Sequence, residues 1–206
     1  MKRLKQFLTL MAFLTIGSQV MAQSKTQFAV GLKAGPNFAR LNTDANAGAN
    51  YNNRTGFHAG AFMLLRGERV GFQPEVIFSQ QGATGHYSGQ PDLKSNFSYV
   101  NIPLIVKLYT VAGINLQVGP QFGFLTSAKS NYDPSSNQLL PSERDVKDAY
   151  NKSDVSLALG VGWDLPFGFS IDGRYNWGLS DINSGAGGTV KNQVWQFSVG
   201  YKFLKF

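Results

Sequence analysis

The chain has 206 residues, which suits one domain of ordinary size. Only 15% of the residues are charged, against roughly 25% in ordinary soluble domains, while Gly is the commonest residue at 23. A mean hydropathy of -0.16 excludes a bundle of transmembrane helices, and the lack of Cys excludes disulfides and thiolate metal sites. The net charge is +7, but the basic residues are scattered, so we expect no nucleic acid partner.

Residues 1–22 have the features of a secretory signal peptide. Lys2, Arg3 and Lys5 supply a basic start, an apolar stretch runs over residues 7–16, and residues 20–22 form a small-residue cleavage motif. The apolar stretch is shorter than the ~20 residues of a membrane-spanning helix, which disfavours the alternative of a single membrane anchor. We therefore expect export, with residues 23–206 as the mature domain.

From residue 27 onward, the chain consists of eight segments in which apolar residues alternate with small or polar ones. This period of two is typical of β-strands with two different faces. The last segment shows it most clearly, because every second residue is aromatic or aliphatic and the residues between are Gln, Ser, Gly and Lys. The expected strands span residues 27–41, 55–66, 70–81, 97–109, 114–125, 154–165, 169–179 and 195–203.

The connections between these segments alternate between long and short. Long polar loops are expected at residues 42–54, 82–96, 126–153 and 180–192, and short turns at 67–69, 110–113 and 166–168. Outer-membrane barrels have an even number of strands, short periplasmic turns and longer external loops. The sequence therefore predicts an all-β fold, an eight-stranded antiparallel up-and-down transmembrane β-barrel. Within the longest loop, residues 142–150 fit either a short external helix or a solvated loop.

The composition of the two faces indicates which one points outward. A soluble eight-stranded carrier of the lipocalin kind also alternates, but its outer face needs many Lys and Glu residues. Here the polar face is mostly Gly, Ser, Asn and Gln, which suits a narrow lumen filled by side chains. We expect the apolar face to contact lipid, with two aromatic girdles at headgroup level. They comprise Trp163, Phe169, Tyr201 and Phe203 at the periplasmic rim, and Trp177 and Trp195, with Phe124, at the outer rim.

Four prolines fall inside the predicted strands. Proline removes a donor from the hydrogen-bond ladder and normally avoids central strands. We expect β-bulges or strand ends at these positions, which are Pro36, Pro74, Pro103 and Pro120.

A few charged residues fall on the predicted inward face. Glu75 on the third strand and Arg174 on the seventh lie near mid-strand, and these strands are opposite in a ring of eight. Lys33 and Asp172 lie at similar heights. Because buried charges need partners, we predict a cross-lumen ion-pair network of these four residues. It fits a structural plug, with a proton or ion path as the alternative.

No constellation of residues predicts catalysis or metal binding. His58 lies in a strand without a nucleophile motif, and His86 lies in a predicted loop. Two His residues without Cys or clustered carboxylates do not form a metal site. We therefore expect no cofactor.

Several sequence blocks resemble the PorT-like outer-membrane β-barrel proteins of Bacteroidota. They are residues 31–38, 72–82, 99–104, 117–121 and 197–203, so the resemblance extends over the mature chain. It implies an eight-stranded barrel in the outer membrane, contacting lipid and inserted by the barrel-assembly machinery. It also implies a link to protein secretion through an envelope partner. Family chains often stop at the first Phe, whereas this chain continues after Phe203 to Phe206. Simple alternation would place Phe206 on the opposite face of the strand from Phe203.

These observations favour a non-enzymatic outer-membrane barrel that is structural or binds a partner in the cell envelope. The alternatives are a small-solute channel, a lipid-modifying barrel enzyme that uses His58, and a soluble ligand carrier.

Overall fold

The computed structural model describes residues 26–43, 50–86, 93–132, 144–145, 151–180 and 190–206. The predicted signal peptide, residues 1–22, lies outside them. Within these ranges, no helix is long and apolar enough to cross a membrane.

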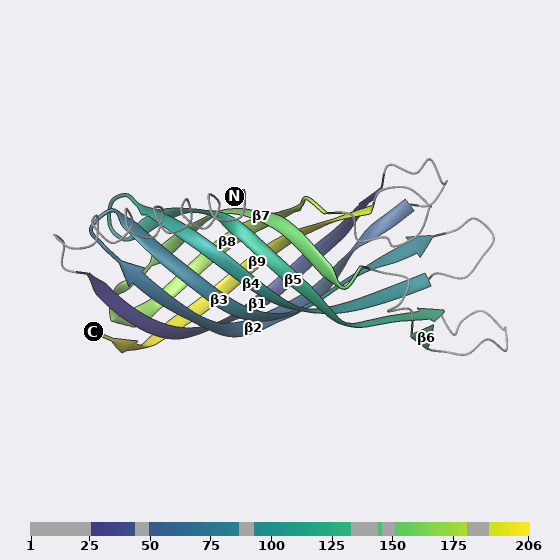
Figure 1. Ribbon diagram of the computed structural model, residues 1–206, viewed down its shortest axis with the longest axis horizontal. Coiled ribbons are helices and arrows are strands. Elements are labelled where there is room, and N and C mark those ends of the chain that lie inside the picture. The colour runs from purple at the N-terminus through teal and green to yellow at the C-terminus, as the bar shows by residue number, and fades with distance from the viewer. Residues whose placement is uncertain (1–25, 44–49, 87–92, 133–143, 146–150, 181–189) are drawn as a thin grey trace, which may run out of the picture.

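Eight long antiparallel strands form one closed sheet (Figure 1). Strands adjacent in sequence pair with each other, and β1 pairs with β9 to complete the ring. The predicted eight-stranded antiparallel barrel is therefore confirmed. The long strands are β1 (Gln27–Thr43), β2 (Asn50–Arg66), β3 (Val70–His86), β4 (Leu93–Tyr109), β5 (Ile114–Tyr132), β7 (Ser153–Asp164), β8 (Phe169–Gly178) and β9 (Val190–Lys205). A 3-10 turn, η2 (Pro166–Gly168), joins β7 to β8.

Several strands are longer than predicted. Strands β1 to β4 have 17 residues each and β5 has 19, whereas roughly 9–11 suffice to cross a bilayer. The predicted loops at residues 42–54, 82–96 and 126–153 are therefore too long, because their first and last residues continue the hairpins. The sequence there contains few apolar residues to mark a period of two, yet the backbone pairing continues.

The segment 142–150, for which either a short external helix or a solvated loop was expected, forms a strand where the structure describes it. Residues Arg144–Asp145 form a two-residue strand, β6, that pairs with the outer end of β5. The remaining residues of that segment lie outside the described ranges.

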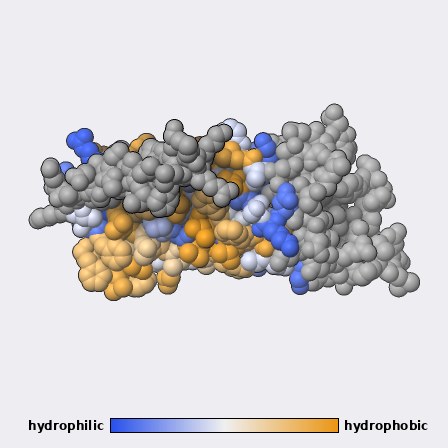
Figure 2. All heavy atoms as spheres, in the orientation of Figure 1, coloured by the Kyte–Doolittle hydropathy of each residue, from blue (hydrophilic) through white to orange (hydrophobic). Residues whose placement is uncertain are grey.

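The apolar residues of the strands face outward. Exposed fractions reach 58% at Leu32 and 57% at both Val76 and Val161, while the alternate positions are buried. On the face shown in Figure 2, apolar residues gather over the middle of the barrel and toward the end with the short turns. Several apolar residues are exceptions: Phe62 and Leu64 are buried with Ala29 in a small apolar cluster, and Ile77 and Ile105 are also buried. A soluble carrier would bury its apolar face, so this arrangement is the reverse of that alternative.

The four prolines do not cause bulges or strand ends, so that prediction is wrong. Each proline is paired on one side only, and the ladder on the other side omits it without changing register. The pairs are Pro36 with Phe57, Pro74 with Leu104, Pro103 with Gln121 and Pro120 with Leu157. The missing donor is therefore accommodated by a local gap in the ladder. The register shifts lie elsewhere, between Asn53 and His58 and between Ser98 and Tyr99, for example.

A bulge at the β1–β9 seam determines how the chain end is placed. Val30 pairs with Leu204 but Gly31 pairs with Lys202, so Phe203 is an extra residue. Beyond the bulge, Phe28 and Phe206 exchange two backbone hydrogen bonds of 3.0 and 2.8 Å, and their ring centroids are 6.1 Å apart. The bulge therefore absorbs the extra register step, and Phe203 and Phe206 are both exposed, at 50% and 77%.

We predict that Gly35→Ala destabilises the seam. At the Pro36 gap the two strands approach so closely that a Cβ on Gly35 would overlap the carbonyl oxygen of Phe197. Because a backbone atom cannot swing away, the expected cost is about 1–3 kcal/mol, measured as a lower urea midpoint of the barrel in detergent. Gly67→Ala is the control, since the nearest atom to a Cβ there is 3.4 Å away. Equal midpoints for the two variants would contradict the tight seam.

Candidate functional site in the barrel lumen

The inward faces of the strands carry a polar interior. Glu75, Asp172 and Arg174 are only 2%, 2% and 3% exposed, and Lys33 is 4% exposed. In a closed barrel these charges are screened from bulk water, so each needs a partner within the lumen.

Arg174 and Glu75 form a two-bond ion pair across the lumen. Nη2 of Arg174 donates to Oε1 of Glu75 at 2.6 Å, and Nη1 donates to Oε2 at 2.9 Å. Two parallel bonds of this kind fix both the distance and the orientation of the guanidinium. Gln73 donates to Oε1 of Glu75 at 2.6 Å, and Nε of Arg174 donates to Gln117. The pair therefore joins β3 to β8 and, through Gln117, to β5.

Lys33 and Asp172 belong to the same network. Nζ of Lys33 lies 3.2 Å from Oδ2 of Asp172 and 3.6 Å from Oε1 of Glu75. Asp172 also accepts a hydrogen bond from Gln117 and lies 3.9 Å from Nζ of Lys107. The structure thus brings Lys33, Glu75, Asp172 and Arg174 together in one continuous set of contacts.

A second charged cluster lies nearer the short turns. Asp164, at the end of β7, contacts Nζ of Lys107 at 3.2 Å and Nζ of Lys202 at 2.7 Å. The Tyr109 hydroxyl donates to the same carboxylate at 2.8 Å. Sequence reasoning did not assign this cluster, although alternation places Lys107, Asp164 and Lys202 on the inward face. Lys107 links the two clusters through its contacts with Asp164 and Asp172.

His58 occupies a hydrogen-bonded position toward the opposite end. Its Nδ1 is 2.7 Å from Oδ1 of Asn37 and its Nε2 is 2.8 Å from Oγ of Ser198. Because the Asn37 amide nitrogen donates to Ser79 at 2.8 Å, its oxygen accepts from His58, and Nε2 accepts from the Ser198 hydroxyl.

This order of groups matches a serine–histidine relay, with Asn in the place of the acid. However, Asn37, His58 and Ser198 are only 0%, 1% and 4% exposed. We therefore interpret the relay as hydrogen bonding that ties β1, β2 and β9 together inside the barrel.

Neutral side chains fill much of the remaining interior. Toward the long hairpins, Phe97, Tyr99, Leu125 and Ala128 form a buried apolar cluster. Among the residues that the structure describes, no group of three or more His, Asp or Glu side chains is placed to hold a metal ion.

The predicted girdle residues lie on the outer surface, most of them near strand ends, whereas Trp195 lies five residues inside β9. Phe169 pairs with Tyr201 near the short turns, and Tyr175 pairs with Trp195 further along the same two strands. Trp163 lies one residue before the end of β7 and donates its ring N–H to the carbonyl of Ala112 at 3.0 Å. Trp163, Phe169, Trp177, Trp195, Tyr201 and Phe203 are all exposed.

Comparisons with known proteins gave one family match and several similar solved structures, of which the family match and the first structure below support this architecture. A family model described as "Outer membrane protein beta-barrel domain" matches residues 21–184. Neisserial surface protein A (NspA) is similar with a TM-score of 0.57 and 13% identity, over 84% of this chain and 97% of that chain. The attachment invasion locus protein Ail of Yersinia pestis gives 0.48 and 16%, over 88% and 99% of the two chains. The N-terminal barrel domain of Pseudomonas aeruginosa OprF gives 0.38 and 10%, over 85% and 97%. No curated protein matches the chain.

We predict that Arg174→Met strongly destabilises the barrel. The change leaves Glu75 without its main partner in a buried site, at an expected cost of about 3–5 kcal/mol. The double variant Glu75→Gln/Arg174→Met should recover part of that loss, because no uncompensated carboxylate remains. Urea unfolding in detergent, with the exposed Arg69→Met as control, measures both effects. An unchanged urea midpoint for Arg174→Met would show that the Arg174–Glu75 pair does not stabilise the barrel.

Proposed function

Since the chain belongs to the family of outer membrane protein beta-barrel domains, we propose that it is a non-enzymatic, non-conducting barrel that presents a binding surface outside the membrane. The observation that carries this proposal is the filled lumen. The bonded pair of Arg174 and Glu75, at 2.6 and 2.9 Å, crosses the lumen at mid-height, and further ion pairs lie toward the turn end. Such an interior supports a structural plug better than a path for solutes.

The proposed orientation places the short turns, the start of β1 and the end of β9 in the periplasm, and the long hairpins outside the cell. The exposed apolar faces then contact outer-membrane lipid, with the aromatic girdle residues at the two headgroup regions. The chain would reach this position through a signal peptide at residues 1–22 and the barrel-assembly machinery.

The long hairpins supply the surface for a partner. Strands β1 to β5 are each at least 17 residues long, so paired backbone continues beyond the part needed to cross the membrane. A paired hairpin is stiffer than a loop, which lowers the entropic cost of binding. The finer form of this proposal, from the resemblance to PorT-like proteins of Bacteroidota, is that the partner is an envelope protein involved in secretion.

Membrane fractionation tests the location. We expect the protein in the outer-membrane fraction, with heat-modifiable mobility on a gel because a closed barrel resists unheated detergent. A soluble periplasmic pool would overturn the proposal. Crosslinking from the long hairpins, followed by pull-down, then identifies the partner.

Planar-bilayer recording tests the filled lumen. The wild-type barrel should give no stable single-channel openings, because side chains and ion pairs occupy its interior. The double variant Glu75→Ala/Arg174→Ala removes the central pair and should give larger leak currents than an Arg69→Ala control. Stable openings of the wild-type protein would instead support a small-solute channel.

A further inference from the structure

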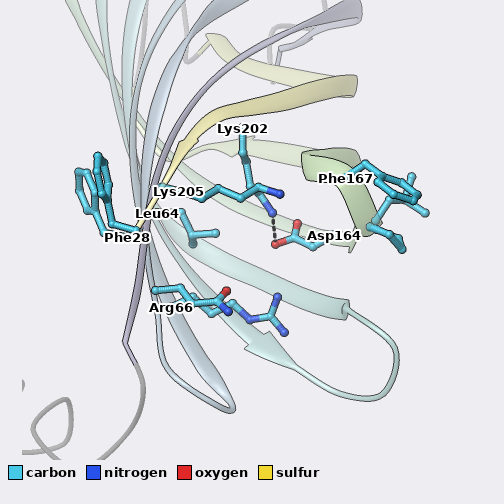
Figure 3. Close-up of a pocket in the computed structure, with 12 residues that line it drawn as sticks. Phe28, Leu64, Arg66, Asp164, Phe167, Lys202 and Lys205 are labelled. Carbon is cyan, nitrogen blue, oxygen red and sulfur yellow. Dashed lines mark ion pairs between the residues drawn. The ribbon is translucent and has the colours of Figure 1, made fainter.

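A basic pocket opens at the turn end of the barrel. It has a volume of about 390 Å³ and is bounded by the ends of β1, β2, β7 and β9 together with η2. In Figure 3, the charged groups of Arg66, Lys202, Lys205 and Asp164 point into the space, and Phe28 and Phe167 lie on opposite sides of it.

The pocket carries more positive than negative charge. Its lining includes three cationic side chains and one carboxylate, that of Asp164. Asp164 is already engaged by Lys202 at 2.7 Å and Lys107 at 3.2 Å. In the part of the chain that the structure describes, neither Arg66 nor Lys205 forms an ion pair; the Arg66 guanidinium lies 3.9 Å from the centroid of the Tyr109 ring. The pocket therefore has two cationic side chains, Arg66 and Lys205, that pair with no carboxylate side chain of the described residues.

The fold places Lys205 in the pocket by two separate features. Without the bulge at Phe203, alternation would turn Lys205 to the lipid side and Leu204 inward. Gly168 in η2, with a φ of 96°, then leaves room, because a Cβ there would lie 3.0 Å from Nζ of Lys205. The ammonium of Lys205 thus lies against the β7–β8 turn and lines the same pocket as Arg66.

The rim of the pocket is apolar and exposed. Phe28 and Phe206 form one side, with ring centroids 6.1 Å apart. Phe167 forms the other and is 88% exposed at a φ of 64°, a conformation that is unfavourable for a bulky side chain. A phenyl ring held out in a strained turn, beside a basic cavity, suits contact with acyl chains at the membrane interface.

We propose that this pocket binds the phosphate head group of an anionic phospholipid in the leaflet that surrounds the turn end. Arg66 and Lys205 pair with the phosphate, and the acyl chains extend over Phe28, Phe206 and the outer surface of β9. Arg and Lys are the residues that bind phosphate most readily, and basic pockets at membrane level recognise anionic lipids. The apolar rim distinguishes a lipid from free phosphate. The inference rests on the proposed membrane location of the barrel.

Native mass spectrometry of the full-length barrel in detergent tests the proposal. Short-chain phosphatidylglycerol, phosphatidylcholine of the same chain length and inorganic phosphate are titrated separately. We expect the wild-type protein to retain phosphatidylglycerol preferentially. Arg66→Gln/Lys205→Gln should reduce that preference on the order of tenfold, since each lost cation weakens the attraction to anionic lipid. Arg69→Gln, which removes a cation at the same end outside the pocket, should keep the wild-type preference.

Three results would overturn the proposal. They are equal retention of the two lipids by the wild-type protein, an equal loss in Arg69→Gln, and inorganic phosphate binding as tightly as phosphatidylglycerol. Heat-modifiable mobility of every variant shows that the barrel is folded, so a lost preference cannot reflect unfolding. The measurement is made in detergent, so its failure is distinct from a failure of the proposed location, which only fractionation detects.

Discussion

The structure depends on one constraint, that a closed eight-stranded wall leaves a lumen too narrow for bulk water to solvate charges. Every ionised group that points inward must find its counter-charge on another strand. Glu75 and Arg174 meet this requirement across the lumen. Lys33 and Asp172 pair with each other, and Lys33 also contacts Glu75. Neutral amides such as Gln117 add further hydrogen bonds to these charged groups. Because the contacts join strands on several sides of the ring, the interior also holds the wall in shape, and the outward side chains need only be compatible with lipid.

The two ends of the barrel differ in how the strands are connected. At the turn end, tight connections bring Asp164, Lys202 and Lys205 together around one opening. At the opposite end, paired hairpins extend beyond the apolar region, and an apolar cluster around Tyr99 fills the space between them. One end therefore offers a small charged cavity beside lipid, and the other an extended surface away from it.

The sequence was sufficient for the fold and for much of the interior. Alternation indicated the strands, and their even number and loop asymmetry indicated the barrel. Charges are rare on the inward face, so Glu75 and Arg174 stood out on opposite strands. The cluster around Asp164 was not assigned, because heights on non-adjacent strands depend on register shifts such as those at Val30 and Ser98, which no sequence pattern marks. The prolines led to a wrong prediction of bulges or strand ends. In this closed sheet each proline is simply unpaired on one side, and the register of the strands does not change.

The long sequence separations within the lumen network have a consequence for the order of folding. Lys33 and Asp172 are 139 residues apart, and Glu75 and Arg174 are 99 apart, so these bonds join the first half of the chain to its last quarter. On an open sheet the same groups are far from one another and remain hydrated. They can pair only when β8 and β9 arrive and β1 accepts the final strand. Contacts of such range form late and slowly. We therefore expect one cooperative event, in which the interior loses water, the charges pair and the seam closes. A chain that stops before β8 would leave Lys33 and Glu75 without their partners Asp172 and Arg174.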